Sequence, residues 1–125
     1  MQNDQPETTP SAFSGLELLS SAVVLVDDQL VVRYLNPGAE NLFAVSRRKT
    51  VGYALRRLLG EPAGLASALD NVLRDKWSYT SHNLTVTRPG LEPLHLDCTV
   101  TPVECAEARL LLEIRPMDAQ LKVAR

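Results

Sequence analysis

Hydrophobic and polar positions follow two different periods along this chain, and the changes of period divide it into elements. Residues 22–26 form the continuous apolar run AVVLV, which is too short for a helix and predicts a strand buried on both faces. Strand-forming residues resume at 30–35 after the polar turn 27–29, so a β-hairpin is expected. The apolar run is therefore the predicted central strand of a sheet.

Helical segments are expected after the hairpin. The Asn-Pro dipeptide at 36–37 favours a helix start, because Asn caps free backbone amides and Pro at the first helical position needs no amide of its own. Ser46 is placed to cap a second short helix, which Gly52 can end in a left-handed conformation. Apolar residues at helical spacing then predict a third helix near 54–59 and a longer one at 64–76.

A period of two governs most of the remaining chain. Residues 79–87 and 94–101 alternate around a Pro-Gly turn at 89–90, and the even-numbered residues of 79–87 are expected to share one face. The last strand, 110–114, is apolar on both faces. Two strands, several helices and three strands predict an α+β domain with an antiparallel sheet and helices on one face.

The apolar positions of these elements also predict a core. Each predicted core residue occupies the apolar register of its helix or strand. We expect six side chains to be buried: Leu25, Leu42, Phe43, Leu69, Leu96 and Leu112.

The first half of this pattern resembles a PAS domain. The resemblance rests on the order and spacing of several short motifs: VLVD at 24–27, a hairpin, NPGA at 36–39, Leu42-Phe43, Ser46 and Gly52. It implies a PAS fold with a five-stranded antiparallel sheet in the order 2-1-5-4-3 and helices on one face. Apolar residues at helical spacing (Phe13, Leu16, Leu19 and Ala22) add an amphipathic helix at the N-terminus. The predicted segments are a disordered leader (1–10), an N-terminal helix (11–21), the PAS domain (22–118) and the start of a linker helix (119–125).

The end of the last strand departs from the Asp-Ile-Thr ending common in PAS domains. The sequence EIRPMD at 113–118, together with VLVDD at 24–28, resembles the N-terminal PAS domain of the nitrogen-regulation sensor histidine kinases of the NtrB family. That resemblance implies a cytoplasmic homodimeric kinase of a two-component system. Such a kinase autophosphorylates on His, passes the phosphoryl group to the response regulator NtrC, and acts as its phosphatase when the PII protein binds.

The kinase activity is expected of a parent chain and not of this segment. The 125 residues contain neither a His-Glu phosphoacceptor motif nor a Gly-rich ATP lid. The alternative is a ligand-binding PAS sensor domain of another signalling protein, such as a transcription regulator or a cyclic-dinucleotide enzyme.

Composition narrows the class of partners. A chain of 125 residues with 45% hydrophobic content suits one domain, and 13 basic against 15 acidic residues give a net charge of −2. We therefore expect binding to neither nucleic acid nor membrane. The sequence has no apolar run of transmembrane length and no secretory signal, so a cytoplasmic location is expected. Cys98 and Cys105 are expected to be reduced thiols.

Candidate chemical groups are few, and structural roles explain them better. His82 and His95 lie on strands, away from the helix that carries the axial ligand in haem-binding PAS domains, and their spacing is not a metal motif. Cys98 is expected to pack inward, and the pair at 27–28 to form a turn.

The expected catalytic, cofactor and metal residues are therefore none. Flavin-binding LOV domains carry Asn-Cys-Arg-Phe where this chain has ENLFA at 40–44, so flavin photochemistry is not expected. The basic clusters at 47–49 and 56–57 fit either a solvated surface or a grip on an anionic metabolite.

A dimer interface is the principal site that the pattern predicts. Phe13, Leu16 and Leu19 form an apolar stripe, and Leu111 lies on the sheet face that no predicted helix covers. We expect these four residues to form a homodimer interface, with a helix folded back onto its own sheet as the alternative. Three residues are expected to form the junction to the signal linker: Pro116, Met117 and Asp118.

Overall fold

The computed structural model describes residues 21–62, 64–88 and 90–117 of the chain. Two strands, four helices and three strands follow one another in these residues. The elements are β1 (Ala22–Val26), β2 (Val32–Leu35), α1 (Pro37–Phe43), α2 (Arg47–Thr50), α3 (Arg56–Leu59), α4 (Leu65–Asp75), β3 (Tyr79–Arg88), β4 (Leu91–Pro102) and β5 (Leu110–Pro116). The element order matches the one predicted from the sequence.

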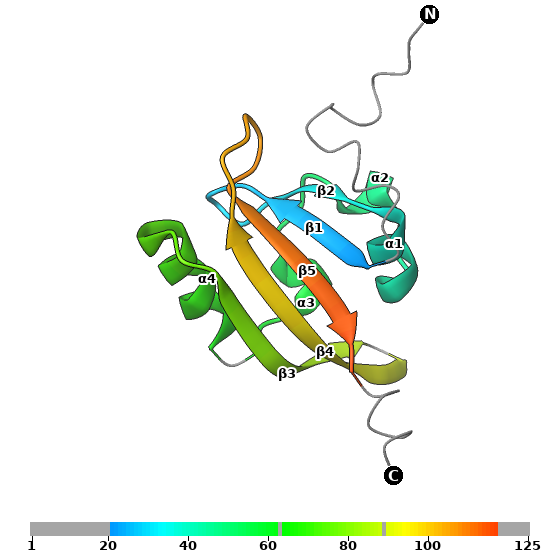
Figure 1. The fold of residues 1–125 in the computed structure, drawn as a ribbon. Helices are drawn as coiled ribbons and strands as arrows, with labels where there is room; N and C mark the ends of the chain where they lie inside the picture. Colours follow the sequence, from blue (N-terminus) through cyan, green and yellow to red (C-terminus); the bar gives the residue numbers. More distant parts are fainter. Residues whose placement is uncertain (1–20, 63, 89, 118–125) are drawn as a thin grey trace, which may run out of the picture.

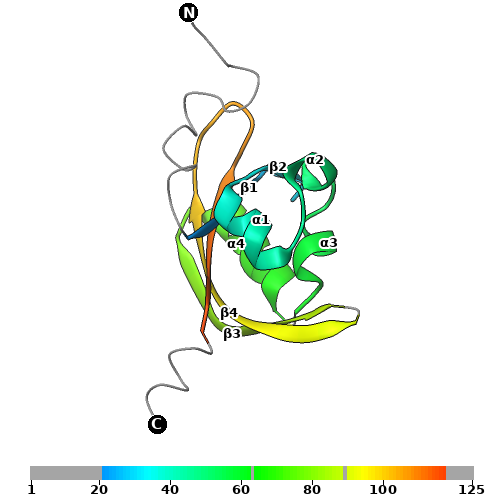
Figure 2. The same ribbon diagram turned by 90° about the vertical axis from the view of Figure 1, so that its right-hand side faces the viewer.

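The strands form one sheet in the order β2-β1-β5-β4-β3, and all four neighbouring pairs are antiparallel. Figure 1 shows the sheet with α1, α3 and α4 behind or beside it, and the turned view of Figure 2 places the four labelled helices on the same side of the sheet. The predicted α+β class, the order 2-1-5-4-3 and the position of the helices on one face are therefore confirmed. In the described residues, no helix is long and apolar enough to cross a bilayer.

The main core lies between the sheet and the helices. Leu69 of α4, Leu96 of β4 and Leu112 of β5 are almost fully buried there, as predicted, and Phe43 joins them from α1. Leu25 is also buried, but it belongs to a second, smaller cluster on the opposite face of the sheet.

The prediction that Leu42 is buried is wrong. The face of α1 that meets the core is formed by Ala39 and Phe43, which are four residues apart and so lie one above the other on the helix. Leu42 is rotated away from that line and packs at the margin of the core, where it stays partly exposed.

Asn36 joins the start of the sheet to the first helix. Its Oδ1 accepts hydrogen bonds from the backbone amides of Val23 and Ala39, both at 2.9 Å, and its Nδ2 donates to the Ser21 carbonyl at 2.8 Å. The residue is fully buried, so these bonds replace the water that an exposed amide would bind. The sequence predicted the cap on α1, and the structure shows that the same side chain also fixes β1.

The boundaries of several elements differ from the prediction for local reasons. Leu30 has a left-handed backbone (φ 62°), so β2 begins only at Val32. α2 ends at Thr50, and its capping residue Val51 is extended, so the helix does not reach Gly52. In the other direction, β4 begins at Leu91 and includes Pro93. Pro93 has no backbone amide to donate, but no hydrogen bond to β5 is lost, because the pairing of β4 with β5 begins only at Leu96.

A β-bulge interrupts β3. The register against β4 shifts between Ser81 and Leu84, so the two residues between them lie opposite the single residue Asp97. The Oδ1 of Asp97 accepts a hydrogen bond from the Asn83 amide at 3.1 Å, and Asn83 adopts a left-handed backbone, with φ 61°. The prediction that the even-numbered residues of this strand share one face is therefore wrong. The extra residue turns the first part of the strand over, so Thr80 lies on the face away from the helices.

Candidate functional site

The sheet face opposite the helices, here called the outer face, is apolar at its β2-β1-β5 end. Leu25 of β1 lies beside Tyr34 of β2 and Leu111 of β5. Leu25 and Tyr34 are 1% and 2% exposed, whereas Leu111 retains partial exposure. The outer face therefore has its own small hydrophobic cluster, separate from the main core.

The β4–β5 connection completes this cluster. Ala108 is fully buried against Leu25 and Tyr34, and Val103 and Cys105 pack on its margin. Backbone bonds hold the connection in place, because the Val103 amide donates to the Arg109 carbonyl at 2.8 Å and the Arg109 amide donates to the Val26 carbonyl at 2.8 Å. The sequence alone does not predict this packing role, because the spacing of residues 103–108 carries no sign of it.

The β3-β4 end of the outer face is polar. Alternation places the threonines of β3 and β4 there, together with charged residues of β4 and β5. Three side-chain pairs lie on it: Thr80 with Thr99 (Oγ1 to Oγ1, 3.2 Å), Thr85 with His95 (Oγ1 to Nδ1, 3.4 Å), and Glu113 with Arg115 (Oε2 to Nη1, 3.7 Å).

The residues expected to form a dimer interface fall into two groups. Phe13, Leu16 and Leu19 lie outside the described residues. Leu111 lies at the centre of the sheet on the outer face and is partly exposed, as the prediction requires. Its participation in an interface stays a prediction.

The residues expected at the signal junction lie at the end of β5. Pro116 pairs with Leu96 as the last residue of the strand, and the Met117 amide donates to the His95 carbonyl at 3.0 Å. Asp118 lies outside the described residues. Because Ala22 at the start of β1 lies beside Ile114 near the end of β5, the chain enters and leaves the sheet at the same end.

The histidines lie apart from any cluster of metal-ligand side chains. The His82 Nδ1 is 3.4 Å from the Asp97 Oδ1 at the bulge, and its side chain is largely exposed. Among residues 21–62, 64–88 and 90–117, no three His, Cys, Asp or Glu side chains gather as a metal site would require. The expectation that haem, flavin and metal are absent stays a prediction.

Cys98 faces the main core, as predicted. It is fully buried, and burial raises the pKa of its thiol to about 12, although the charge of Arg115 acts in the other direction. A thiol with this pKa is protonated at neutral pH and is a poor nucleophile. The predicted packing role is therefore confirmed.

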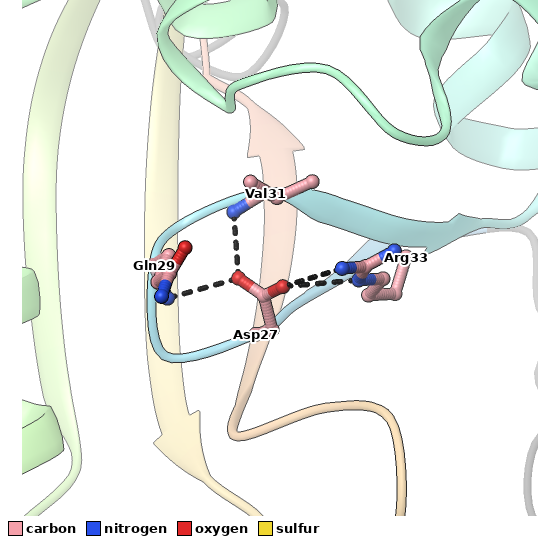
Figure 3. Close-up of polar contacts among 4 residues, drawn as sticks. All are labelled: Asp27, Gln29, Val31 and Arg33. Carbon is pink, nitrogen blue, oxygen red and sulfur yellow. Dashed lines mark hydrogen bonds and ion pairs between the residues drawn. The ribbon is translucent and has the colours of Figure 1, made fainter.

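Asp27 forms the turn that the sequence predicts, and Figure 3 shows its contacts. One carboxylate oxygen, Oδ1, accepts hydrogen bonds from the amides of Gln29 (2.9 Å) and Val31 (3.0 Å). The other, Oδ2, lies 2.9 Å from the Arg33 Nη2 and 3.0 Å from its Nε. Asp28 is exposed at the tip of the turn.

These contacts change the acidity of Asp27. Burial acts to raise the pKa of this carboxyl group, but the Val31 and Gln29 amides and the Arg33 guanidinium stabilise its charged form. The net pKa lies below the ordinary value of 3.8. The carboxylate is thus a structural acceptor that is charged at neutral pH.

A cavity of about 470 Å³ opens where the β1–β2 turn meets α3 and the start of α4. Leu30, Leu55, Leu59 and Leu69 supply much of its wall, and Arg56 lies at its polar margin. Its volume is in the range that small ligands occupy. The sequence predicted Leu69 only as a core residue, because periodicity does not show where helices leave a gap.

Comparison with known proteins supports the resemblance seen in the sequence. A family profile described as the PAS fold matches residues 16–114. The chain is 32% identical over 117 residues to the sensory histidine kinase/phosphatase NtrB of Vibrio alginolyticus, and 31% identical over 118 residues to that of Klebsiella oxytoca. These matches cover 93% and 94% of this chain but 33% of each relative, so the chain spans about a third of their length.

Solved structures give the same result. The crystal structure of the PAS domain of nitrogen regulation protein NR(II) from Vibrio parahaemolyticus is similar with a TM-score of 0.74 and 31% identity, over 87% of this chain and all of that one. A PAS domain from Colwellia psychrerythraea shares the fold with a TM-score of 0.71 but 14% identity, over 86% of this chain and 94% of that one. The predicted resemblance to the NtrB PAS domain is confirmed.

The contacts of Asp27 predict a pH-dependent contribution to stability. Asp27→Asn keeps a side-chain acceptor for the turn amides but removes the charge that Arg33 and those amides stabilise. We expect it to lower the free energy of unfolding by about 0.5–1.5 kcal/mol near pH 7, measured by urea denaturation. The pKa is lower in the folded state, so this contribution is present above the unfolded value and is lost as pH falls through the folded value.

The difference between the wild type and Asp27→Asn should therefore disappear in acid. Asp28→Asn is the matched control, because Asp28 is exposed in the same turn. It should change the free energy of unfolding by no more than about 0.5 kcal/mol at any pH. Equal effects of the two substitutions near pH 7 would contradict the assigned role of Asp27.

Proposed function

The chain belongs to the PAS family, and from its similarity to the NR(II) PAS domain over all of that domain's length we propose that it senses and relays signals in an NtrB-like two-component histidine kinase. The observation that carries the proposal is the joint agreement of sequence and fold, at 31% identity and a TM-score of 0.74. Solved structures of much lower identity, such as the Colwellia psychrerythraea PAS domain at 14%, support the fold alone.

In this proposal the domain itself is not catalytic. The ATP-dependent autophosphorylation on His and the kinase and phosphatase reactions on NtrC belong to the parent chain, as does the response to the PII protein. The parent kinase works in the cytoplasm as a homodimer. The domain contributes dimerisation and signal relay to the catalytic part.

The geometry of the sheet supports relay. β1 and β5 are neighbours, and Val24 of β1 pairs with Leu112 of β5 while both side chains lie in the main core under the helices. A change in the packing of the helices therefore reaches the two strands that continue into the flanking segments. Pro116, Met117 and Asp118 form the junction through which the signal leaves the domain.

The outer face supports dimerisation. Its apolar end presents Leu111 at partial exposure, and a second copy or a flanking helix would cover it. We place the helix carrying Phe13, Leu16 and Leu19 on this face, paired with its counterpart around a two-fold axis. Such an arrangement brings the two Asp118 ends together, from which a coiled coil leads to the kinase.

A second candidate function is the binding of a small ligand by a PAS sensor of another signalling protein. The cavity beside α3 and α4 favours it, because its volume of about 470 Å³ is enough for a metabolite. Native mass spectrometry of the purified chain distinguishes the two candidates, since a retained ligand of fixed mass favours the second.

Sedimentation equilibrium tests the dimer. The native chain is expected to be a homodimer at micromolar concentration, and the double variant Phe13→Asp, Leu16→Asp is expected to be a folded monomer, because buried carboxylates oppose association. Leu91→Asp is the control, since Leu91 is 57% exposed on β4, and it should leave the dimer intact. A monomeric native chain, or a double variant that stays dimeric, would show that this interface is wrong.

A chimera tests the kinase assignment. Residues 1–117 of this chain would replace the matching PAS segment of Klebsiella oxytoca NtrB, whose similarity spans 94% of this chain. We expect the chimera to phosphorylate NtrC and to switch to phosphatase activity with PII, measured with radiolabelled ATP. A chimera with the Colwellia psychrerythraea PAS domain, which shares the fold at 14% identity, is the control that should lose PII-dependent switching. Equal behaviour of the two chimeras would remove the NtrB-specific part of the proposal.

A further inference from the structure

The basic residues of the chain are unevenly distributed. Residues 45–60, which include α2 and α3, contain five basic side chains (Arg47, Arg48, Lys49, Arg56 and Arg57) and no carboxylate. The chain has 13 basic and 15 acidic residues, so the rest of the chain carries eight basic residues and all 15 acidic ones. The segment is therefore a local positive surface on a chain that is otherwise strongly negative.

A groove runs through this surface between the end of α1, α2 and α3. Its volume is about 430 Å³, and its lining includes Ser46, Lys49, Thr50, Tyr53 and Arg57 but no acidic side chain. In Figure 2, α2 and α3 lie one above the other at the right of the view, on the helical side of the sheet. The groove thus opens on the helical layer, and it is distinct from the outer face of the sheet and from the cavity beside α4.

Lys49 and Arg57 of this groove differ in pairing from Arg33 and Arg115 of the sheet. Arg33 and Arg115 each lie within 4 Å of a carboxylate, at 2.9 and 3.7 Å. Within residues 21–62, 64–88 and 90–117, by contrast, Lys49 and Arg57 form no ion pair. Their positive charge is therefore available to a partner.

Tyr53 adds an aromatic contact to these charges. Tyr53 is 48% exposed, and the Arg57 guanidinium lies over its ring at 4.4 Å from the ring centre. Stacking of this kind holds the planar guanidinium in one orientation while leaving its edge donors open. Those donors match the two oxygens of a carboxylate.

We propose that the groove between α2 and α3, here called the basic groove, is a docking site for an acidic protein segment with clustered Asp and Glu side chains. Three exposed side chains suit the binding of such a segment: Lys49 and Arg57 would bind its carboxylates, and the Tyr53 ring would contact an adjacent side chain. The site lies apart from the outer face, so docking and dimerisation can occur together.

The same observations disfavour other anions. A nucleic acid or an anionic membrane extends beyond one short groove, and the excess of acidic residues over the rest of the chain would repel it. A free phosphate or small metabolite is held best by buried donors, whereas Ser46, Lys49 and Arg57 are exposed. A compact acidic segment meets neither difficulty.

Fluorescence anisotropy with a labelled peptide of alternating Glu and Asp tests the proposal on the whole chain. We expect saturable binding at low salt that weakens as salt rises. The double variant Lys49→Glu, Arg57→Glu should raise the dissociation constant by about tenfold or more. Tyr53→Ala, which preserves the net charge, should also raise it.

The matched control is the double variant Arg74→Glu, Lys76→Glu, which makes the same change of net charge at the exposed end of α4. It should keep the dissociation constant within about twofold. Circular dichroism checks that all variants are folded. The proposal is overturned if the peptide fails to bind, if the control loses as much affinity, or if single-stranded DNA, phosphatidylserine vesicles or inorganic phosphate bind this groove more tightly than the peptide.

Discussion

The buried amide of Asn36 is the contact on which the arrangement of sheet and helices depends most. Its Oδ1 accepts from the Val23 amide of β1 and the Ala39 amide of α1, and its Nδ2 donates to the Ser21 carbonyl just before β1. Its own amide donates to the Val23 carbonyl at 3.0 Å. A fully buried side chain that fills these roles is specific to Asn, because Asp lacks the donor and would bury a charge.

This contact gives the two ends of the domain a common reference. The chain enters the sheet at β1, which Asn36 ties to the helical layer, and leaves it at β5, which pairs with every residue of β1. The helices therefore act on both chain ends through the same pair of strands. The two surfaces proposed for partners lie on opposite sides of this pair, with the outer face of the sheet on one side and the basic groove on the other.

Most of the fold was predictable, because each element is specified locally. The apolar run at 22–26, the Asn-Pro cap and the stripe of α4 determined their elements without reference to tertiary contacts. The predictions from sequence were wrong where tertiary packing or an extra residue determines which side chains face the core. Ala39 and Phe43, and not Leu42, form the buried face of α1. The bulge at the left-handed Asn83 reverses the faces of the first part of β3. The packing of Ala108 and the cavity beside α4 depend on how separate segments meet, which periodicity does not report.

Native-state hydrogen exchange of Asn36→Ala tests the central role of Asn36 most directly. The account predicts that the Val23 amide exchanges much faster in the variant, since it loses its side-chain acceptor. The Ala39 amide should exchange faster by a smaller factor, because it keeps its bond to the Asn36 carbonyl at 2.9 Å. The exchange rates of amides in the β4–β5 ladder should change only with global stability. If the Ala variant does not fold, Asn36→Ser serves, because its shorter side chain can still cap α1 but does not span to Ser21. Equal acceleration at Val23 and at the β4–β5 amides, or no acceleration at Val23 and Ala39, would contradict the account.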